Sequence, residues 1–321
     1  MYQYLYGPVP SRRLGISLGV DLFPRKICSF ACVYCECGKN DRLTSERGEY
    51  VPVDSVLDEL RDYMSKNPAP DYITLSGSGE PTMHTGIGRF IRTVKLEFKD
   101  VRVAVLTNSS LLNLTEVRND LMEADLVLPS LDAATEKAFR TIDRPAPGLD
   151  LNEIISGIAD FTKEFHAASG DKKVYLEVFI IEGINTDREN IDNLRNAILR
   201  IGPDQVQLNT LDRPATENWV KAASKDVLES FREKLHLPNV EIVSKYQNRN
   251  EIKTYRKDAE AAIVDTIGRR PSTINDIQEI TGLHIHELSK YLDILEKEKK
   301  IQAVIRAGGD NRGIFYETVK P

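Results

Sequence analysis

The chain has 321 residues, a hydrophobic fraction of 41%, a formal net charge of −6 and a pI near 5.6. This length predicts one large and one small domain, and the acidic balance excludes a protein covered with basic surface, so that any nucleic-acid contact must be local. No apolar run is long enough to span a membrane, and the first residues lack the basic and apolar regions of a signal peptide, so we expect a cytoplasmic protein without membrane contact.

The chain begins with a stretch rich in Pro and Gly, residues 7–15, which predicts an irregular entry into a strand over 16–23. Arg12 and Arg13 lie in this stretch. They either reach an anionic group of a ligand or, as is more common for such a pair, tie the loop to acidic neighbours.

All four cysteines of the chain follow this strand within ten positions. Cys28, Cys32 and Cys35 have the spacing C-x3-C-x2-C, which lets one loop direct three thiolates at a single centre. Thiolates are soft ligands that suit iron–sulfur clusters or zinc. Four clustered cysteines without a distant partner indicate a metal site and not a disulfide framework. The alternative is a closed structural zinc site that uses all four, with Cys37 as the last ligand.

Strands and helices alternate over the next 200 residues. Near-continuous apolar strands separated by amphipathic helices predict a parallel sheet that is buried on both faces. Together with the first strand they form six βα units, which favours an α/β fold with an open, partial (βα)6 barrel. Active sites of such folds lie in the loops after the strands. The expected helices are 53–67, 84–99, 111–123, 149–166, 190–201 and 225–235, and the further strands are 71–76, 101–107, 125–131, 174–181 and 205–211.

Two of these strand ends have residues suited to ligand binding. Gly77 and Gly79 in Gly77-Ser-Gly-Glu80-Pro allow backbone to approach a ligand closely. Ser130 and Asp132 follow the strand over 125–131, where the alternative is a solvated helix cap.

Polar residues also interrupt the last two strands. Glu177 lies inside an apolar strand and must be paired if it is buried, which makes it a modest functional candidate. Gln207 and Asn209 are expected to face the same way on the strand over 205–211.

The composition becomes polar over residues 246–256, which predicts a linker. Beyond it, a helix, a helix-turn-helix and a β-hairpin predict a winged helix. His284 and His286, at the entry of its third helix, are expected to be surface residues. The predicted domains are 1–245 and 257–321, and the C-terminal elements are helices over 259–268, 271–280 and 286–300 and strands over 301–305 and 314–319.

The cysteine loop, with Tyr34 before its third cysteine, resembles that of the radical S-adenosylmethionine (SAM) superfamily. The wider pattern over residues 6–215 is similar to an iron–sulfur oxidoreductase-like group that includes relatives of wyosine synthase. Wyosine synthases have further N-terminal cysteines for a second cluster. Here Cys37 is the only spare cysteine, which disfavours chemistry that needs a complete second cluster.

The resemblance implies roles for the residues singled out above. It implies a [4Fe–4S] cluster with one open iron, to which the amino and carboxylate groups of SAM bind. Its implied residues are Cys28, Cys32 and Cys35 for the cluster; Gly77, Gly79 and Glu80 for the SAM ammonium; Ser130, supported by Asp132, for the ribose or carboxylate; Asn209 near the adenine; and Tyr34 in the cofactor loop.

Two classes of function follow. The first is a radical SAM enzyme that forms a 5′-deoxyadenosyl radical, abstracts hydrogen from a substrate and takes electrons from a donor such as flavodoxin or ferredoxin. The second is a DNA-binding regulator that senses through its cluster. The C-terminal 65 residues contain ten Lys and Arg against eleven Asp and Glu, which argues against strong duplex binding. We therefore expect recruitment of a macromolecular substrate, with peptide or protein slightly ahead of RNA.

Overall fold

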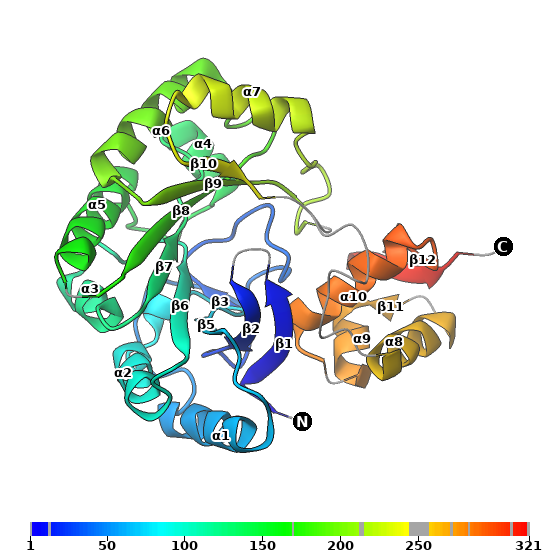
Figure 1. The fold of residues 1–321 in the computed structure, drawn as a ribbon. Coiled ribbons are helices and arrows are strands. Elements are labelled where there is room, and N and C mark those ends of the chain that lie inside the picture. The colour runs from blue at the N-terminus through cyan, green and yellow to red at the C-terminus, as the bar shows by residue number, and fades with distance from the viewer. Residues whose placement is uncertain are drawn as a thin grey trace.

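The computed structural model describes residues 2–11, 14–168, 170–211, 215–243, 257–269, 272–281, 283–308 and 311–319. Arg12, Arg13 and the predicted linker over 246–256 lie outside these ranges. A curved sheet forms the inner layer of the large N-terminal part, and helices cover its outer face (Figure 1). The prediction of an α/β partial barrel is confirmed.

The main sheet has eight strands in the order β1-β2-β5-β6-β7-β8-β9-β10. All neighbours pair in parallel except β1 and β2, which are antiparallel. The six predicted strands are present, and β1 and β10 extend the sheet at its two edges. The strands are β1 (Leu5–Ser11), β2 (Gly15–Val20), β5 (Tyr72–Leu75), β6 (Arg102–Thr107), β7 (Leu126–Pro129), β8 (Lys173–Phe179), β9 (Gln205–Asn209) and β10 (Val240–Ile242), with a separate short pair of β3 (Ile27–Cys28) and β4 (Arg42–Leu43).

Strand β1 occupies part of the stretch over residues 7–15 that was expected to be irregular. It pairs with β2 before and after Gly7 and Pro8, and the register shifts between Tyr6 and Val9. Proline cannot donate a hydrogen bond to a neighbouring strand, so a strand with two prolines is tolerated at the edge of a sheet.

The helices of the barrel follow the predicted order, with one addition. The short helix α4 has seven residues and was not predicted. Side chains accept hydrogen bonds at several helix starts, as Asp150 does from the amides of Asn152 and Glu153. The helices are α1 (Val53–Lys66), the 3-10 turn η1 (Pro81–Met83), α2 (Ile87–Glu97), α3 (Thr115–Leu121), α4 (Glu136–Ile142), α5 (Leu151–Ala167), α6 (Arg188–Ile201) and α7 (Lys225–Leu235).

The strand register places apolar residues level with one another. Val20, Leu75, Val105 and Val127 pair in sequence across β2, β5, β6 and β7, and all four are fully buried. Because side chains alternate between the two faces of a strand, the residues next to these four point into the barrel.

The strands of the main sheet from β2 to β10 are parallel, so their carboxyl ends lie at the same rim of the barrel. The polar loop residues gather at this rim.

The C-terminal segment forms its own core, which includes Ile263, Ile277, Leu288 and Leu292. It lies beside β1, and helix α10 is the element that contacts that strand (Figure 1). Its assignment as a winged helix stays a prediction. The elements are α8 (Lys257–Arg269), β11 (Ser272–Thr273), α9 (Ile274–Thr281), α10 (Ile285–Lys297), β12 (Ile301–Gly308) and β13 (Asn311–Thr318), with sheet order β11-β13-β12.

A membrane-spanning helix would need a long apolar stretch. No helix within the described ranges has one.

Candidate active site

The cysteine loop is held in shape by backbone hydrogen bonds to the segment that follows α4. The amide of Ala31 donates to Asp143 O at 3.0 Å, the amide of Val33 to Ile142 O at 2.9 Å, and the amide of Ala146 to Ser29 O at 2.8 Å. These bonds connect positions more than 100 residues apart in the chain. These bonds join the loop to the end of α4 and to the segment after it.

The chemistry of the loop fits an iron–sulfur cluster. Cys28, Cys32 and Cys35 are half-buried, and the amide group of Asn108 donates to Cys28 Sγ at 3.5 Å. The ammonium of Lys26 donates to the Gly38 carbonyl within the same loop and lies close enough to the cysteines to stabilise negative charge there. Burial raises the pKa of the Cys28 thiol to about 12, so that metal binding has to displace its proton.

Within the described residues, no three His, Cys, Asp or Glu side chains converge as they would on a single ion. The three cysteines that hold a four-iron cluster each bind a different iron atom, so their sulfur atoms need not converge on one point. The assignment of Cys28, Cys32 and Cys35 to such a cluster stays a prediction.

The turn after β5 packs directly against the cysteine loop. A Cβ atom on Gly79 would lie 2.3 Å from the backbone oxygen of Ile27, which also accepts the Glu80 amide at 3.3 Å. A Cβ atom on Gly77 would lie 2.3 Å from Asp21 Oδ1. Glycine is therefore required at both positions by packing, in addition to any contact with a ligand.

Glu80 is buried and accepts four hydrogen bonds. Its Oε1 accepts from the Thr82 amide at 3.0 Å and from the hydroxyls of Thr82 and Thr107 at 2.7 Å, and its Oε2 accepts from the Asn108 amide at 2.7 Å. Burial raises the pKa of Glu80, although these donors counteract the shift. The side chain fixes the end of β5 to the end of β6. Its contact with an ammonium group stays a prediction.

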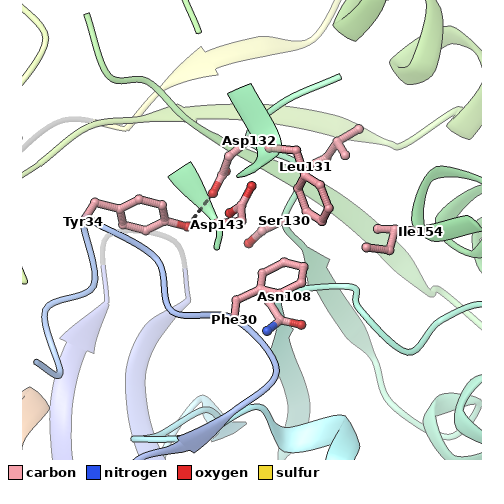
Figure 2. Close-up of a pocket in the computed structure, with 9 residues that line it drawn as sticks. Phe30, Tyr34, Asn108, Ser130, Leu131, Asp132, Asp143 and Ile154 are labelled. Atoms are coloured by element: carbon pink, nitrogen blue, oxygen red, sulfur yellow. Dashed lines mark hydrogen bonds between the residues drawn. The ribbon is translucent and has the colours of Figure 1, made fainter. Parts of the chain in front are cut away.

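A small cavity lies beside the cysteine loop, and Tyr34, Asn108, Ser130 and Asp132 are among its lining residues (Figure 2). The Tyr34 ring stacks on Phe179 at 3.8 Å, and its hydroxyl donates to Asp132. The other oxygen of Asp132 accepts from the Phe179 amide at 2.8 Å. Asp132 is thus no helix cap.

The cap of α4 is a different residue. The side chain of Thr135 accepts from the amide of Ala138 at its start. Asp132 therefore belongs to the cavity.

A second carboxylate, Asp143, also lines the cavity and lies near Asp132 (Figure 2). Burial raises the pKa of Asp132 to about 7, although its hydrogen bonds from Tyr34 and Phe179 counteract the shift. Burial and the Asp132 charge raise the pKa of Asp143 well above its usual value. Cys32 Sγ lies 3.8 Å from Asp143 Oδ1. The two carboxyl groups with raised pKa therefore lie directly beside a predicted cluster ligand.

Comparison with known families decides the family of the chain. A model described as the Radical SAM superfamily matches residues 23–194, which include the cysteine loop and the strand ends around it. The chain belongs to the radical SAM superfamily. Enzymes of this superfamily use a [4Fe–4S] cluster and SAM, so the chain is a radical SAM enzyme with these cofactors.

Individual proteins are similar to the chain over much of its length. "UPF0026 protein MJ1312" of Methanocaldococcus jannaschii is 28% identical over 321 residues, covering 98% of this chain and 96% of the relative. A Brachyspira hyodysenteriae protein named "GTPase Obg" is 33% identical over 312 residues, covering 95% of this chain, and the chain spans only 44% of that relative. A radical SAM methyltransferase from Sphaerobacter thermophilus has a similar fold, with a TM-score of 0.54, 18% identity and coverage of 74% of this chain and 70% of that one.

Not all predicted residues of the radical SAM site lie together. Asn209, at the end of β9, is not among the residues that line the cavity, and its Oδ1 accepts from the Thr210 amide at 2.9 Å. Glu177 is half-buried on β8, and Gln207 is buried on β9. Asn108 connects the cysteine loop, the turn after β5 and the cavity. It contacts Cys28 and Glu80, and it lines the cavity with Ser130.

The expectation that His284 and His286 are surface residues is wrong. His286 Nε2 lies 3.0 Å from the backbone oxygen of Gly77, and His284 Nε2 lies 3.0 Å from Asp21 Oδ2. The side chains of His284 and Asp21 are 13% and 6% exposed. The start of α10 therefore contacts the turn after β5 and the residue that follows β2.

Three residues of the site were missed from the sequence. Asn108 directly follows a predicted strand, so its position was a usable signal. Asp21 lies one residue beyond the end of β2, where it accepts from the Ser78 amide at 2.9 Å and hydroxyl at 2.8 Å. Asp143 gave no signal, because only tertiary folding brings it to the cysteine loop.

Proposed function

We propose that this radical SAM enzyme holds its [4Fe–4S] cluster through Cys28, Cys32 and Cys35 and abstracts a hydrogen atom from a macromolecular substrate. When bound, the cluster supplies one electron to SAM, so that methionine leaves and the 5′-deoxyadenosyl radical attacks the substrate. The main support is the position of the three cysteines. They lie on a loop that backbone hydrogen bonds hold at the rim where β5, β6 and β7 end.

The remaining residues of the site bind and orient SAM. The Gly77 carbonyl accepts a hydrogen bond from the SAM ammonium. Glu80 holds the ends of β5 and β6 together through its own hydrogen bonds. Ser130 contacts the ribose or carboxylate, Asp132 supports it through the Phe179 backbone, and Asn209 lies toward the adenine. The apolar walls of the cavity keep water from the reacting atoms.

Anaerobic reconstitution with iron and sulfide, followed by reduction with dithionite in the presence of SAM, tests this function. We expect 5′-deoxyadenosine and methionine in equal amounts, measured by liquid chromatography and mass spectrometry. A reconstituted four-iron protein that releases neither product would contradict the proposal.

The Ser130→Ala substitution tests the SAM contact. We expect SAM to bind about tenfold more weakly, because loss of a hydrogen bond to a charged group costs about 1.5 kcal/mol. Equilibrium dialysis of the reconstituted protein measures the affinity. Ser65→Ala is the matched control, because the exposed Ser65 hydroxyl only donates to its own helix, to Asp62 O at 2.8 Å. Equal affinities of the two variants would refute the role of Ser130.

The position of α10 favours an enzyme over a DNA-binding regulator. In a winged helix, residues at the start of the third helix contact DNA bases. Here that start is occupied by contacts with Gly77 and Asp21. We keep the order of substrates expected from the sequence, with a peptide or protein slightly favoured over RNA. The electron comes from a donor of the flavodoxin or ferredoxin type. Tight, salt-sensitive binding of the full chain to duplex DNA, measured by fluorescence anisotropy, would reverse this order.

A further inference from the structure

The His286 ring lies on the carbonyl group of Gly77. A carbonyl oxygen only accepts hydrogen bonds, so the His286 nitrogen at 3.0 Å, Nε2, is the protonated one and donates. Cys37 Sγ lies 3.8 Å from the same oxygen as a second donor, and 3.6 Å from His286 Nε2. A carbonyl oxygen has two lone pairs. In this structure both face a donor from the chain itself.

His284 anchors this contact to the barrel. Its Nδ1 accepts from the His286 amide at 3.3 Å, so its Nε2 is protonated and donates to Asp21 Oδ2 at 3.0 Å. Its ring stacks on Tyr6 with centroids 3.8 Å apart and an interplanar angle of 11°. Asp21 in turn accepts from Ser78, in the turn that contains Gly77. The two histidines therefore connect α10 to β1, to the end of β2 and to the turn after β5.

A third contact involves the backbone of β1. The amide of Gly7 donates to Glu287 Oε2 at 3.4 Å. The neighbouring Tyr6 is pressed against β2, because a Cβ atom on Gly19 would lie 2.0 Å from its ring. Helix α10 thus docks on a rigid surface, and its docking fixes the position of the His286 ring.

We propose that His286 and the ammonium group of SAM compete for the Gly77 carbonyl at the methionine end of the SAM site, so that SAM has to displace His286 from this oxygen. This inference rests on the proposed function, in which Gly77 accepts the SAM ammonium. The ammonium has only donors and needs the same oxygen. Its charge-assisted hydrogen bond is roughly twice as strong as that of a neutral imidazole. Replacement of His286 by the SAM ammonium at the Gly77 oxygen is therefore favourable, and it breaks the contact between α10 and Gly77.

Docking of α10 on the barrel and binding of SAM are then two linked equilibria that oppose each other. Docking of α10 weakens SAM binding, and bound SAM weakens docking by the same factor. A macromolecule that binds the C-terminal segment and draws α10 away from β1 would promote SAM binding.

Binding of S-adenosylhomocysteine to the anaerobically reconstituted full chain tests the competition. This probe retains the amino and carboxylate groups of SAM but cannot undergo reductive cleavage, so calorimetry reports affinity without turnover. We expect His286→Ala to bind it about three- to tenfold more tightly, the equivalent of one neutral hydrogen bond. His286→Gln, which keeps a donor, should stay within twofold of the wild type. His284→Ala, which loosens the anchor, should also bind more tightly.

The matched control is His166→Ala. His166 also pairs with an aspartate, Asp204 at 2.8 Å, but it lies at the opposite end of the strands. Its removal should leave the affinity unchanged.

Hydrogen exchange gives a second readout that does not depend on activity. The Gly7 amide, which donates to Glu287 in the docked state, and the first turn of α10 should exchange faster when S-adenosylhomocysteine is bound. Unchanged or weaker binding by His286→Ala, or slower exchange at these amides, would overturn the inference. If the reconstituted wild type binds neither S-adenosylhomocysteine nor SAM, the proposed function itself fails.

Discussion

Replacement of Cys28, Cys32 or Cys35 by Ala is expected to abolish both the iron–sulfur absorption and SAM cleavage, whereas Cys37→Ala retains both. Each of the three cysteines would bind a separate iron atom, so that none can compensate for another. A permanent fourth thiolate would block the iron that SAM needs. Iron and sulfide analysis of anaerobically reconstituted variants, together with measurement of 5′-deoxyadenosine, checks this expectation.

Cys37→Ala is the matched control in this series, because it removes a thiol from the same loop. Loss of the cluster in this variant alone would assign Cys37 as a ligand. Zinc in anaerobically purified wild-type protein would instead support the structural alternative. Either result contradicts the proposed ligand set.

Glu80→Ala is expected to lower the free energy of unfolding by about 3–5 kcal/mol. The substitution leaves the amide of Asn108 and the amide and hydroxyl of Thr82 without their buried acceptor, and each such group costs about 1–3 kcal/mol. Urea denaturation of the metal-free protein measures the change.

Glu116→Ala provides the control for Glu80. Glu116 is 67% exposed and pairs with Arg47 at the surface, so its loss should cost less than about 1 kcal/mol. Equal stability of the two variants would show that the hydrogen bonds of Glu80 contribute nothing to folding. Because of this expected instability, reduced SAM binding by Glu80→Ala has a structural explanation as well as a direct one, and Ser130→Ala is the cleaner test.

The order of strands and helices in the barrel was predictable because each element has a local signal. The apolar runs of β6 and β7 and the amphipathic faces of α1 and α6 depend only on nearby residues. The position of the cysteine loop after the first parallel strand followed from spacing and from the rule for strand ends.

Other features depended on contacts that no local pattern encodes. Strand β10 has three residues, too few for a period, and β1 contains prolines that usually interrupt strands. The winged-helix pattern predicted a helix over 286–300. It gave no information on what the start of this helix touches, so that His284 and His286 were misplaced at the surface.

The backbone bonds that hold the cysteine loop have a consequence for how the enzyme matures. Ala31, Val33 and Ser29 are bonded to the segment after α4 through peptide groups alone, without any sulfur. In small zinc domains the metal drives folding, and the chain collapses only when it binds. Here the loop is also held by backbone bonds that involve no iron ligand. We therefore expect a chelator to remove the iron and leave a folded protein that can be loaded again.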